Sequence, residues 1–386
     1  MHFFFNGKLK ANFLTFKRYT HVDVDLLSKI NIKNVGPFDG GGISVDFKPL
    51  TIIVGANNTG KSSILYSFDI CRSNEFPPFA FKINDNISLA QYMHDPANKG
   101  RIELTVDFDT HEIRKTTELE YLKPPFTQGR TLKSTTIVQN KIAMQNLAYN
   151  KDFDSIEKRI FERFNEFVNN ATFLLADRTF VPSQIIVGKS GKKILPKGEN
   201  TIAFLLERWT DQDARWPELL TWLKLIDVNV TQLKTPLRGN QVSIETRRTY
   251  GNNELDVNIF QQGSGIHRAI QIISALVFSP PGSLIIIEEP EMNLHKGAQE
   301  VIADLINKSI NEHGMQVIIT THSFDFLLPY ISDMGIGKAR GNDHIKISKD
   351  KVQLVELSIN NGKIIAKQDI KGKFTTIRDE LKTILG

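Results

Sequence analysis

The stretch Thr51-Ile-Ile-Val-Gly55-Ala-Asn-Asn-Thr-Gly-Lys61-Ser62 decides the fold class of this chain. An apolar strand runs into a glycine loop that fits Gly-x-x-x-x-Gly-Lys-Ser in full, and residues 62–70 have the pattern of a helix. In this context the loop is a phosphate-binding P-loop, because successive backbone N–H groups converge on a phosphate and the helix N-terminus favours its negative charge. We therefore predict an α/β fold that binds ATP.

Two side chains of this loop have individual predicted roles. Lys61 would bridge the β- and γ-phosphate oxygens, and Ser62 would hold Mg²⁺. The nucleotide-binding residues predicted here are Gly55, Asn57, Asn58, Thr59, Gly60, Lys61, Ser62 and Ser63.

A second apolar strand ends in two acids, in Ser283-Leu-Ile-Ile-Ile-Glu288-Glu289-Pro290. Two adjacent carboxylates are costly to bury unless a cation offsets them. Since side chains alternate along a strand, one acid can face Mg²⁺ while the next reaches the attacking water. We predict that Glu288 holds Mg²⁺ through water and that Glu289 is the general base. The alternative is a solvated loop of acids.

A third apolar strand ends in a histidine, in Val317-Ile-Ile-Thr-Thr-His322-Ser323. A lone histidine after a strand is more often a hydrogen-bonded structural residue. Its position after the two acids, with a helix expected between at 296–313, favours a catalytic role for His322. It would sense the γ-phosphate and position the nucleophile.

Two further motifs complete the predicted site. Gly263, Ser264 and Gly265 open a helix and form a second anion-binding N-terminus. A plain turn is the default interpretation of that motif alone, but it is explained if it caps the γ-phosphate bound by another subunit. Gln91 is a candidate to contact Mg²⁺ and the attacking water, although His94 is nearby and equally polar.

The composition indicates a water-soluble protein with a large core. The 386 residues are 40% hydrophobic and 24% charged, and the single cysteine excludes an internal disulfide framework and fits a cytoplasmic location. No run approaches the roughly 18 apolar residues of a membrane helix, so we expect no membrane partner. The net charge of +5 is compatible with nucleic acid, but a solvated mixed surface explains the scattered lysines and arginines about as well.

The order of patterns divides the chain into four predicted segments. Residues 1–26 are a lead-in, and residues 27–109 form an ATPase N-lobe that holds the P-loop. Residues 110–250 are predicted to be a largely helical insertion, because amphipathic helices are expected near 153–168 and 201–226. Residues 251–386 form a C-lobe with the acids and the histidine, a hairpin turn at Asn360-Asn361-Gly362 and a closing helix at 375–385.

Taken in order, these parts resemble the ABC-type ATPase head of SMC-like proteins, and most of all the overcoming-lysogenization-defect (OLD)-like ATPases. The wording that carries the resemblance is Asn-Ile-Lys-Asn-Val-Gly-Pro-Phe before the P-loop, Gly-Ala-Asn-Asn-Thr-Gly-Lys-Ser-Ser within it and Glu-Glu-Pro-Glu-Met-Asn-Leu-His295 after the acids. The stretch Phe173-Leu-Leu-Ala-Asp-Arg178 is also similar to one that these proteins carry. The resemblance implies a P-loop NTPase of ABC-head type, with a mixed sheet, flanking helices and an antiparallel β portion.

The resemblance also implies partners and cofactors. Each ATP, with Mg²⁺, would lie between Lys61 of one subunit and the Gly263–Gly265 loop of the other in a homodimer or a higher homo-oligomer. At the position where the family has its signature serine, this chain has Gly263. The contact of this loop with ATP would therefore be made mainly by backbone N–H groups. Larger OLD-like nucleases add a Toprim domain rich in acids. Since no such cluster follows Asp350, we expect no nuclease in this chain.

Three classes of function remain to be compared. Short OLD-like ATPases resemble the ATPase components of two-gene anti-phage systems of the Septu or PARIS type, which implies a sensor or regulatory ATPase with a separate effector nuclease or toxin. The alternative is a DNA-processing ATPase of the SMC or recombination-repair type, against which the absence of a long coiled-coil pattern counts modestly. The wording after the acids and the large insertion argue against the third class, the ATP-binding subunit of a transporter.

Overall fold

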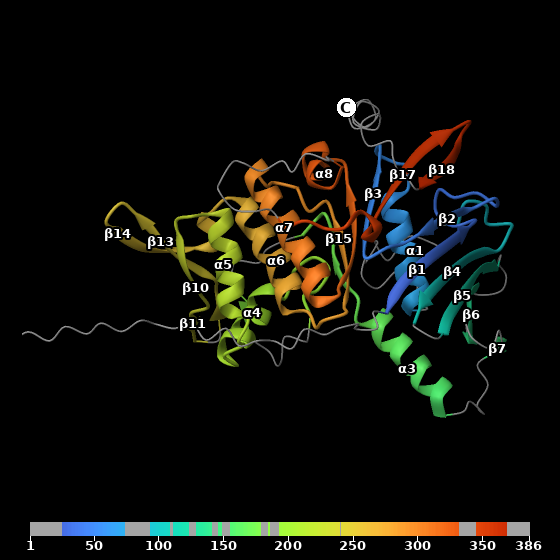
Figure 1. Ribbon diagram of the computed structural model, residues 1–386, viewed down its shortest axis with the longest axis horizontal. Helices are drawn as coiled ribbons and strands as arrows, with labels where there is room; N and C mark the ends of the chain where they lie inside the picture. Colours follow the sequence, from blue (N-terminus) through green and yellow to red (C-terminus); the bar gives the residue numbers. More distant parts are fainter. Residues whose placement is uncertain are drawn as a thin grey trace, which may run out of the picture.

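The computed structural model describes residues 25–73, 93–108, 111–122, 129–140, 146–148, 155–178, 184–185, 193–239, 241–331 and 345–368. Its central layer is a six-stranded sheet in the order β18-β17-β3-β16-β15-β8 (Figure 1). The strands are β18 (Lys363–Gln368), β17 (Val352–Asn360), β3 (Leu50–Gly55), β16 (Gln316–Thr321), β15 (Leu284–Glu288) and β8 (Thr172–Leu174). All but β18 run parallel, so their carboxyl ends meet at one edge of the sheet.

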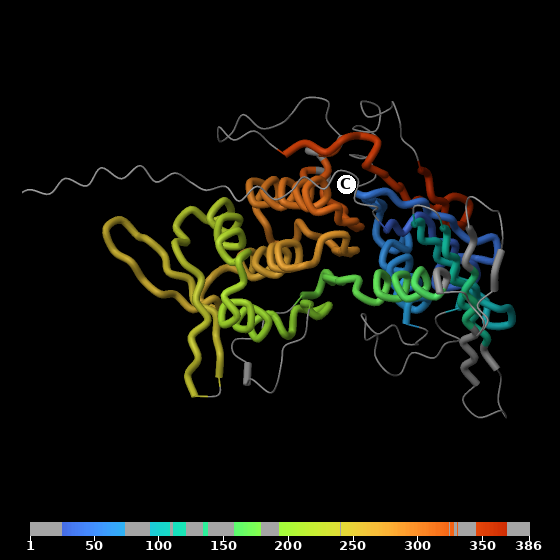
Figure 2. Tube along the Cα trace, turned by 60° about the horizontal axis from the view of Figure 1, so that its bottom comes forward, coloured from blue at the N-terminus to red at the C-terminus, as the bar shows by residue number. Residues whose placement is uncertain are grey.

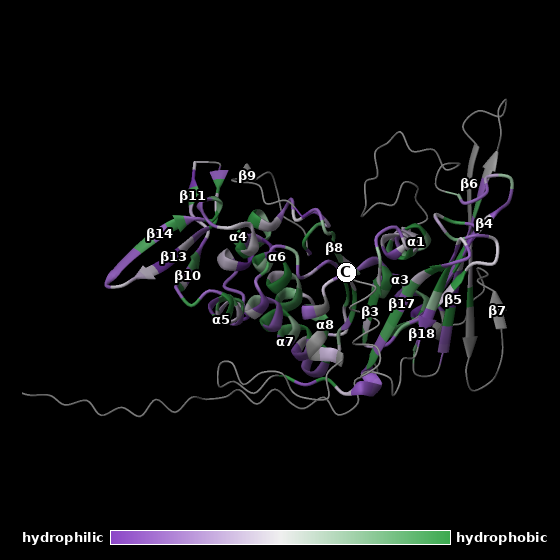
Figure 3. Cartoon of the chain, turned by 90° about the horizontal axis from the view of Figure 1, so that it is seen from above, coloured by the Kyte–Doolittle hydropathy of each residue, from purple (hydrophilic) through white to green (hydrophobic). Residues whose placement is uncertain are grey.

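Both faces of β3, β15 and β16 are buried, which explains why these strands are largely continuous apolar runs in the sequence. Along β3, Leu50, Ile52 and Val54 face one hydrophobic core, and Ile53 faces the other. Figure 3 shows the hydrophobic residues concentrated on β3, β17 and the helix α6 (Ser264–Phe278). The sheet is therefore the rigid platform from which the loops at its carboxyl edge project.

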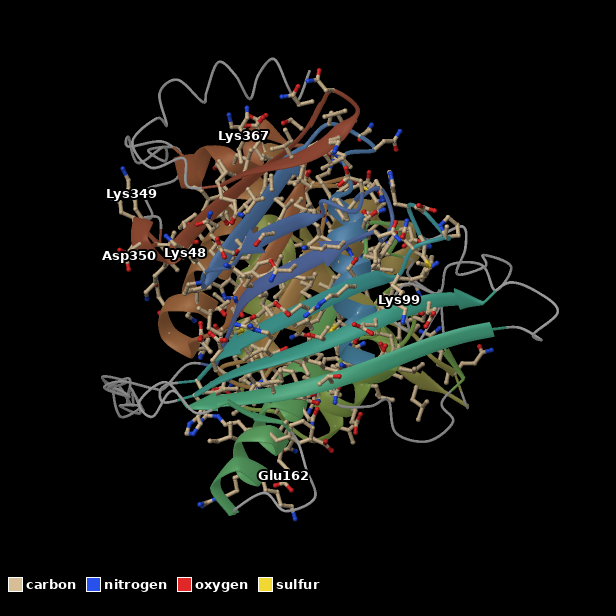
Figure 4. The ribbon with its side chains drawn as sticks, turned by 90° about the vertical axis from the view of Figure 1, so that its right-hand side faces the viewer. Lys48, Lys99, Glu162, Lys349, Asp350 and Lys367 are labelled. Atoms are coloured by element: carbon tan, nitrogen blue, oxygen red, sulfur yellow. The ribbon has the colours of Figure 1, made fainter. Side chains whose placement is uncertain are left out.

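One face is covered by α1 (Lys61–Ser73) and a second, antiparallel sheet in the order β2-β1-β4-β5-β6-β7. Its strands are β2 (Ile43–Asp46), β1 (Leu26–Lys33), β4 (Gly100–Asp107), β5 (His111–Leu122), β6 (Gly129–Asn140) and β7 (Asn146–Ala148). Phe68 of α1 shares a core with Ile102 of β4 and Ile318 of β16, so the P-loop helix lies between the two sheets. Figure 4 faces the outer side of the antiparallel sheet, where charged side chains such as Lys99 lie.

The opposite face of the central sheet is covered by helices (Figure 1). Helices α6, α7 (Lys296–His313) and α8 (Phe324–Ile331) belong to this layer, and α5 (Trp216–Ile226) packs on the outside of α6 and α7, next to α4 (Thr201–Thr210). Beyond them lie two small sheets, one of β10 (Val230–Lys234), β13 (Glu245–Tyr250) and β14 (Asn253–Asn258), the other of β9 (Gln184–Ile185), β11 (Leu237–Arg238) and β12 (Gln241–Val242). The β13–β14 hairpin projects at the end of the molecule (Figure 2).

The prediction of a largely helical insertion at residues 110–250 is wrong in its secondary structure. The segment holds α3 (Ser155–Asn169), α4 and α5, but its first part is β5–β7, which extend the antiparallel sheet, and β8 joins the central sheet. Along β5 the residues facing α1 alternate with the exposed ones, as in any strand. Two of the inward residues are Lys115 and Thr117, and Lys115 Nζ donates to the carbonyl of Arg72 at 2.9 Å. Because polar residues also lie on the buried face of β5, its sequence shows no clear alternation of apolar and polar residues.

Other expectations from the sequence have mixed outcomes. The region 201–226 is two helices rather than one, because the chain turns at residues 211–215 and Pro217 lies in the first turn of α5. Residues 345–348 have no regular structure. The Asn361-Gly362 hairpin is confirmed, since both residues have positive φ as a type I′ turn requires. The closing helix, Gln91 and residues 1–24 of the lead-in lie outside the described residues.

The aromatic residues of α4 and α5 pack mainly as core. Trp216 and Trp222 are buried, whereas Trp209 is half exposed and packs against Trp216 with ring centroids 5.1 Å apart. In the described part of the chain, no helix is long and apolar enough to cross a lipid bilayer.

Candidate nucleotide-binding site

The P-loop connects β3 to α1, and its backbone adopts the conformation that such a loop requires. Asn58 has φ +65° and Gly60 has φ +88°, both in the left-handed region that asparagine and glycine tolerate best. A Cβ added to Gly60 would lie 2.9 Å from the ring of Phe38, so glycine is also needed for packing. Thr59 Oγ1 donates to the carbonyl of Ala56 at 2.8 Å and fixes the curve of the loop.

Lys61 lies inside this loop. Its Nζ donates to the carbonyls of Gly55 at 2.7 Å and Ala56 at 2.9 Å, which leaves the third ammonium proton for another acceptor. Burial lowers the pKa of the Lys61 ammonium, and the nearby carboxylates of Glu289 and Glu288 oppose that shift. A phosphate group fits the remaining donor, since an anion would offset the cost of burying the ammonium.

A cleft of about 590 Å³ opens above the loop and brings together residues from three separate motifs. Its walls come from the P-loop, from the turn after β15 and from the end of β16. The lining residues are Pro37, Asn57, Asn58, Gly60, Lys61, Ser62, Ser63, Glu289, Thr320 and His322. Of the predicted nucleotide-binding residues, Asn57, Asn58 and Gly60–Ser63 thus line one cleft with both predicted catalytic residues.

Glu288 ends β15 and is buried beneath this cleft. Its Oε2 accepts from the backbone N–H of Ala176 at 3.3 Å, and the Ser62 side chain also bonds to its carboxylate. Burial raises the pKa of the Glu288 carboxyl, and the hydrogen bond from Ser62 opposes that shift. The second oxygen, Oε1, is buried without a partner. A hard cation that prefers oxygen ligands fits this oxygen and the Ser62 hydroxyl, so these residues suit Mg²⁺.

Within the described residues, no group of three or more His, Cys, Asp or Glu side chains is arranged to hold a metal ion. In nucleotide sites Mg²⁺ is commonly bound by one or two protein oxygens together with phosphates and water. The third predicted metal residue, Gln91, lies outside the described part of the chain.

Glu289 and His322 face each other across the carboxyl edge of the sheet. His322 Nε2 is hydrogen-bonded to Glu289 Oε1, so the two predicted catalytic side chains are directly paired. Glu289 has φ +45°, a left-handed conformation that is strained for a glutamate. Its backbone N–H donates to the carbonyl of Thr320 at 2.8 Å, which ties the turn after β15 to β16.

Three residues of the site were missed by sequence reasoning. Glu291 accepts from Thr321 Oγ1 at 2.6 Å and from the backbone N–H of His322 at 3.2 Å, and burial raises the pKa of its carboxyl. The motif Glu-Glu-Pro-Glu already contained this residue, but without an assigned role. Arg178 and Arg268 lie beside the acids. The motif Ala-Asp-Arg pointed to Arg178, whereas no sequence signal marked Arg268.

The Gly263–Gly265 loop lies elsewhere in the subunit. Gly263 caps the N-terminus of α6, and both Gly263 and Ser264 are exposed. Gly263 and Gly265 line a different cavity, of about 580 Å³, together with the β13–β14 hairpin and residues 293–295. A single chain therefore does not bring this loop to its own P-loop cleft.

The sheet order, the P-loop after β3, the acids after β15 and the histidine after β16 define a P-loop NTPase with the ABC-type head fold. A family model described as "AAA domain, putative AbiEii toxin, Type IV TA system" matches residues 50–328. Because this match covers well over half of the chain, the protein belongs to that AAA domain family. The predicted fold class is thereby confirmed.

Individual proteins support the same class. The chain is 23% identical over 330 residues to the OLD nuclease of Thermus scotoductus, in a match that covers 77% of this chain and 59% of that protein. The chain thus spans less than two thirds of the length of this relative. This match supports the predicted relation to OLD-like ATPases, and the Septu or PARIS assignment stays a prediction.

Solved structures are similar in fold. An SMC head bound to the C-winged helix domain of ScpA has a TM-score of 0.54 and 14% identity, and the match covers 90% of this chain and 99% of that one. An SMC head domain with an extended coiled coil, bound to the C-terminal domain of ScpA derived from Pyrococcus furiosus, has a TM-score of 0.50 and 12% identity, with 93% and 100% covered. This chain therefore shares its fold with SMC heads.

Proposed function

We propose that this protein hydrolyses ATP with Glu289 as the general base. The observation that carries the proposal is the direct pairing of Glu289 with His322 on the wall of the cleft that also holds Lys61. A carboxylate at that position can take a proton from water, and the hydrogen bond with His322 holds the Glu289 carboxylate in place. If Glu289 and His322 lay on a different surface from Lys61, the structure would support nucleotide binding but not hydrolysis.

The remaining residues of the cleft have complementary roles in this proposal. Lys61 neutralises phosphate charge, while Ser62 and the unpartnered Oε1 of Glu288 would hold Mg²⁺. The metal ion supplies charge stabilisation for the phosphoryl group that is transferred. Because Glu288 is buried, its carboxylate is best stabilised when a cation is next to it.

We further propose that two subunits are needed for each active site. The Gly263–Gly265 loop lies outside the P-loop cleft of its own chain, yet it offers exposed N–H groups at the start of a long helix. Placed against the P-loop of a second copy, this loop would cover the γ-phosphate. The working unit is thus a homodimer with two ATP molecules between its subunits, or a higher oligomer that contains this unit.

The cellular role that fits best is a cytoplasmic sensor or regulatory ATPase of phage defence that acts with a separate effector, a nuclease or a toxin. Its support is the similarity to an OLD nuclease over 330 residues, together with the toxin–antitoxin wording of the family description. The second candidate is a DNA-processing ATPase, which the shared fold with SMC heads and the net charge of +5 favour.

The test is ATP turnover by the purified protein, with and without double-stranded DNA. For a regulatory ATPase we expect slow, Mg²⁺-dependent turnover that DNA does not change. Glu289→Gln should lower kcat by about 100-fold or more, because a general base contributes roughly 10²–10⁴-fold, while ATP still binds. The matched control is Glu162→Gln on the outer side of α3, labelled in Figure 4, which should turn over like the wild type.

Two outcomes would change the proposal. Strong stimulation by DNA that Glu289→Gln abolishes would favour the DNA-processing candidate. A wild-type rate no higher than that of Glu289→Gln in all conditions would show that hydrolysis is not the function of this site.

A further inference from the structure

Arg178 is a buried guanidinium that donates hydrogen bonds to backbone carbonyls at the end of β8 and of the two acids. Only 5% of the residue is exposed. Its Nη1 donates to the carbonyls of Leu175 at 2.7 Å and Glu288 at 2.9 Å, and its Nη2 donates to the carbonyl of Glu289 at 3.3 Å. A buried charge needs counter-charges, and the carboxylates of Glu288, Glu291 and Glu289 supply them. Arg178 is thus held by the site and does not line the cleft.

These contacts act where the backbone is strained. The left-handed φ of +45° at Glu289 is unfavourable for a residue with a Cβ relative to the right-handed region. Its N–H is fixed by the carbonyl of Thr320 and its carbonyl by Arg178, so both sides of the residue are restrained. The strained conformation directs the Glu289 side chain to His322, and loss of the Arg178 contact would release the turn.

A second arginine connects the same backbone to α6. Arg268 Nη1 donates to the carbonyl of Ala176 at 2.5 Å, and the N–H of Ala176 donates to Glu288 Oε2 at 3.3 Å. The single residue Ala176 therefore lies between the helix that Gly263 opens and the buried acid. A hydrogen bond weakens steeply when its geometry is distorted. A shift of the N-terminal part of α6 would therefore move Ala176 and weaken the hydrogen bond that its N–H donates to Glu288.

We infer that Arg178 and Arg268 are positioning residues, which hold Glu288 and Glu289 in their working geometry and couple that geometry to the placement of the Gly263–Gly265 helix. The inference rests on the proposed function, in which Glu289 is the base. It predicts that contact of the Gly263–Gly265 loop with a second subunit changes the rate of hydrolysis and not only the affinity for ATP.

The experiment uses Arg268→Gln, Arg178→Lys and the double variant in the full chain. The matched control is Arg215→Gln, because Arg215 also donates to backbone carbonyls of α6 and the residue just after it, those of Val277 and Ser279, at the far end of the helix. For each variant, kcat, KM and the affinity for a fluorescent ATP analogue are measured. Hydrogen exchange of the backbone amides within residues 288–291, which are those of Glu288, Glu289 and Glu291 because Pro290 has no N–H, gives a readout that does not depend on turnover.

We expect Arg268→Gln and Arg178→Lys each to lower kcat by about 10-fold or more, which corresponds to the loss of one charged hydrogen bond. Affinity for the analogue should stay within about threefold, because the P-loop contacts are untouched, and the double variant should lose less than the product of the two effects. Amides 288–291 should exchange faster in both single variants. Arg215→Gln should keep the wild-type kcat and the wild-type exchange of these amides.

The inference is overturned if Arg268→Gln keeps kcat within twofold of the wild type, or if kcat and ATP affinity fall together as in a general loss of structure. Should Arg178→Lys fail to fold, Arg268→Gln decides, since its side chain is only partly buried. If the wild type itself does not hydrolyse ATP, the proposed function fails, and the exchange of amides 288–291 then tests the positioning role alone. Unchanged exchange in the single variants would exclude it.

Discussion

At the residue scale, the site holds two carboxyl groups, those of Glu288 and Glu291, in positions with little contact with water. Burial raises the pKa of Glu288 and of Glu291, so each carboxyl is harder to ionise in the folded protein than in the unfolded chain. The sign follows from linkage: above the folded pKa the ionised acid favours unfolding, and this penalty disappears as the pH falls below the unfolded value. The acids are thus retained at a cost in stability at neutral and alkaline pH.

We therefore expect Glu288→Gln to stabilise the protein at pH 8 while it abolishes Mg²⁺-dependent turnover. Tm should rise by about 1–3 °C at pH 8, and the gain should shrink toward pH 4.5, where the wild-type carboxyl becomes protonated. Thermal melting at the two pH values checks this, with Glu162→Gln, an exposed acid on α3, as the control that should not change Tm. A lower Tm for Glu288→Gln at pH 8 would contradict the view that this charge is unfavourable.

The sequence predicted the residues that contact nucleotide better than those that support them. Lys61 and Ser62 belong to a short motif with its own local geometry, so their place in the cleft follows from neighbouring residues alone. The contacts of Arg178 with the backbone of Glu288 join positions 110 residues apart, and they exist only because β8 pairs with β15. No local pattern encodes such a contact, so the structure was needed to find it.

At the element scale, α6 is held close to the loop that follows the acids. A Cβ added to Gly265 would lie 2.5 Å from the carbonyl oxygen of Asn293, a backbone atom that cannot move without the loop. Gly265→Ala gains up to about 1 kcal/mol of helix propensity, but overpacking against a backbone atom costs roughly 1–3 kcal/mol. We expect the steric term to prevail, so that the variant unfolds at lower denaturant concentration than the wild type.

Gly263→Ala provides the matched comparison for this prediction. Gly263 is two residues earlier, has an ordinary φ of −64°, and an added Cβ there would meet nothing within 4 Å. Its denaturation midpoint should therefore fall less than that of Gly265→Ala, because only the preference for glycine over alanine at the N-cap is lost and no steric overlap is added. Equal midpoints for Gly263→Ala and Gly265→Ala would show that α6 and the loop at Asn293 do not approach as closely as described.

Elements whose apolar residues recur at a regular spacing were predicted well, whereas elements with polar residues on their buried face were not. Helix α7 has the predicted bounds, since its apolar residues recur at helical spacing and Gly314 ends it with a positive φ. Strand β5 was included in a helical segment because Lys115 and Thr117 occupy its inward face. Those polar residues are satisfied by long-range partners, which only the packed sheets reveal.

At the scale of the whole molecule, the central sheet separates two kinds of surface. Its carboxyl edge gathers the P-loop, the acids and the histidine, while the Gly263–Gly265 loop lines another cavity together with the β13–β14 hairpin. The sequence order of the motifs indicated an ABC-type head. Which motifs share a cleft within one chain depends on the packing of α6 against the sheet, and this could not be read from spacing.

A mixing experiment tests whether active sites form between subunits. Lys61→Ala removes the phosphate contact of one P-loop, and Gly263→Asp places a carboxylate at the open N-terminus of α6, where a Cβ meets nothing within 4 Å. Each variant alone should be inactive, because both sites of its dimer carry the same defect. In a mixed dimer one site has both defects and the other has none. Equal mixing should restore about a quarter of the wild-type rate, since about half of randomly paired dimers are mixed and each has one intact site. If both variants dimerise with ATP and no activity returns, the loop does not act on the P-loop of its partner.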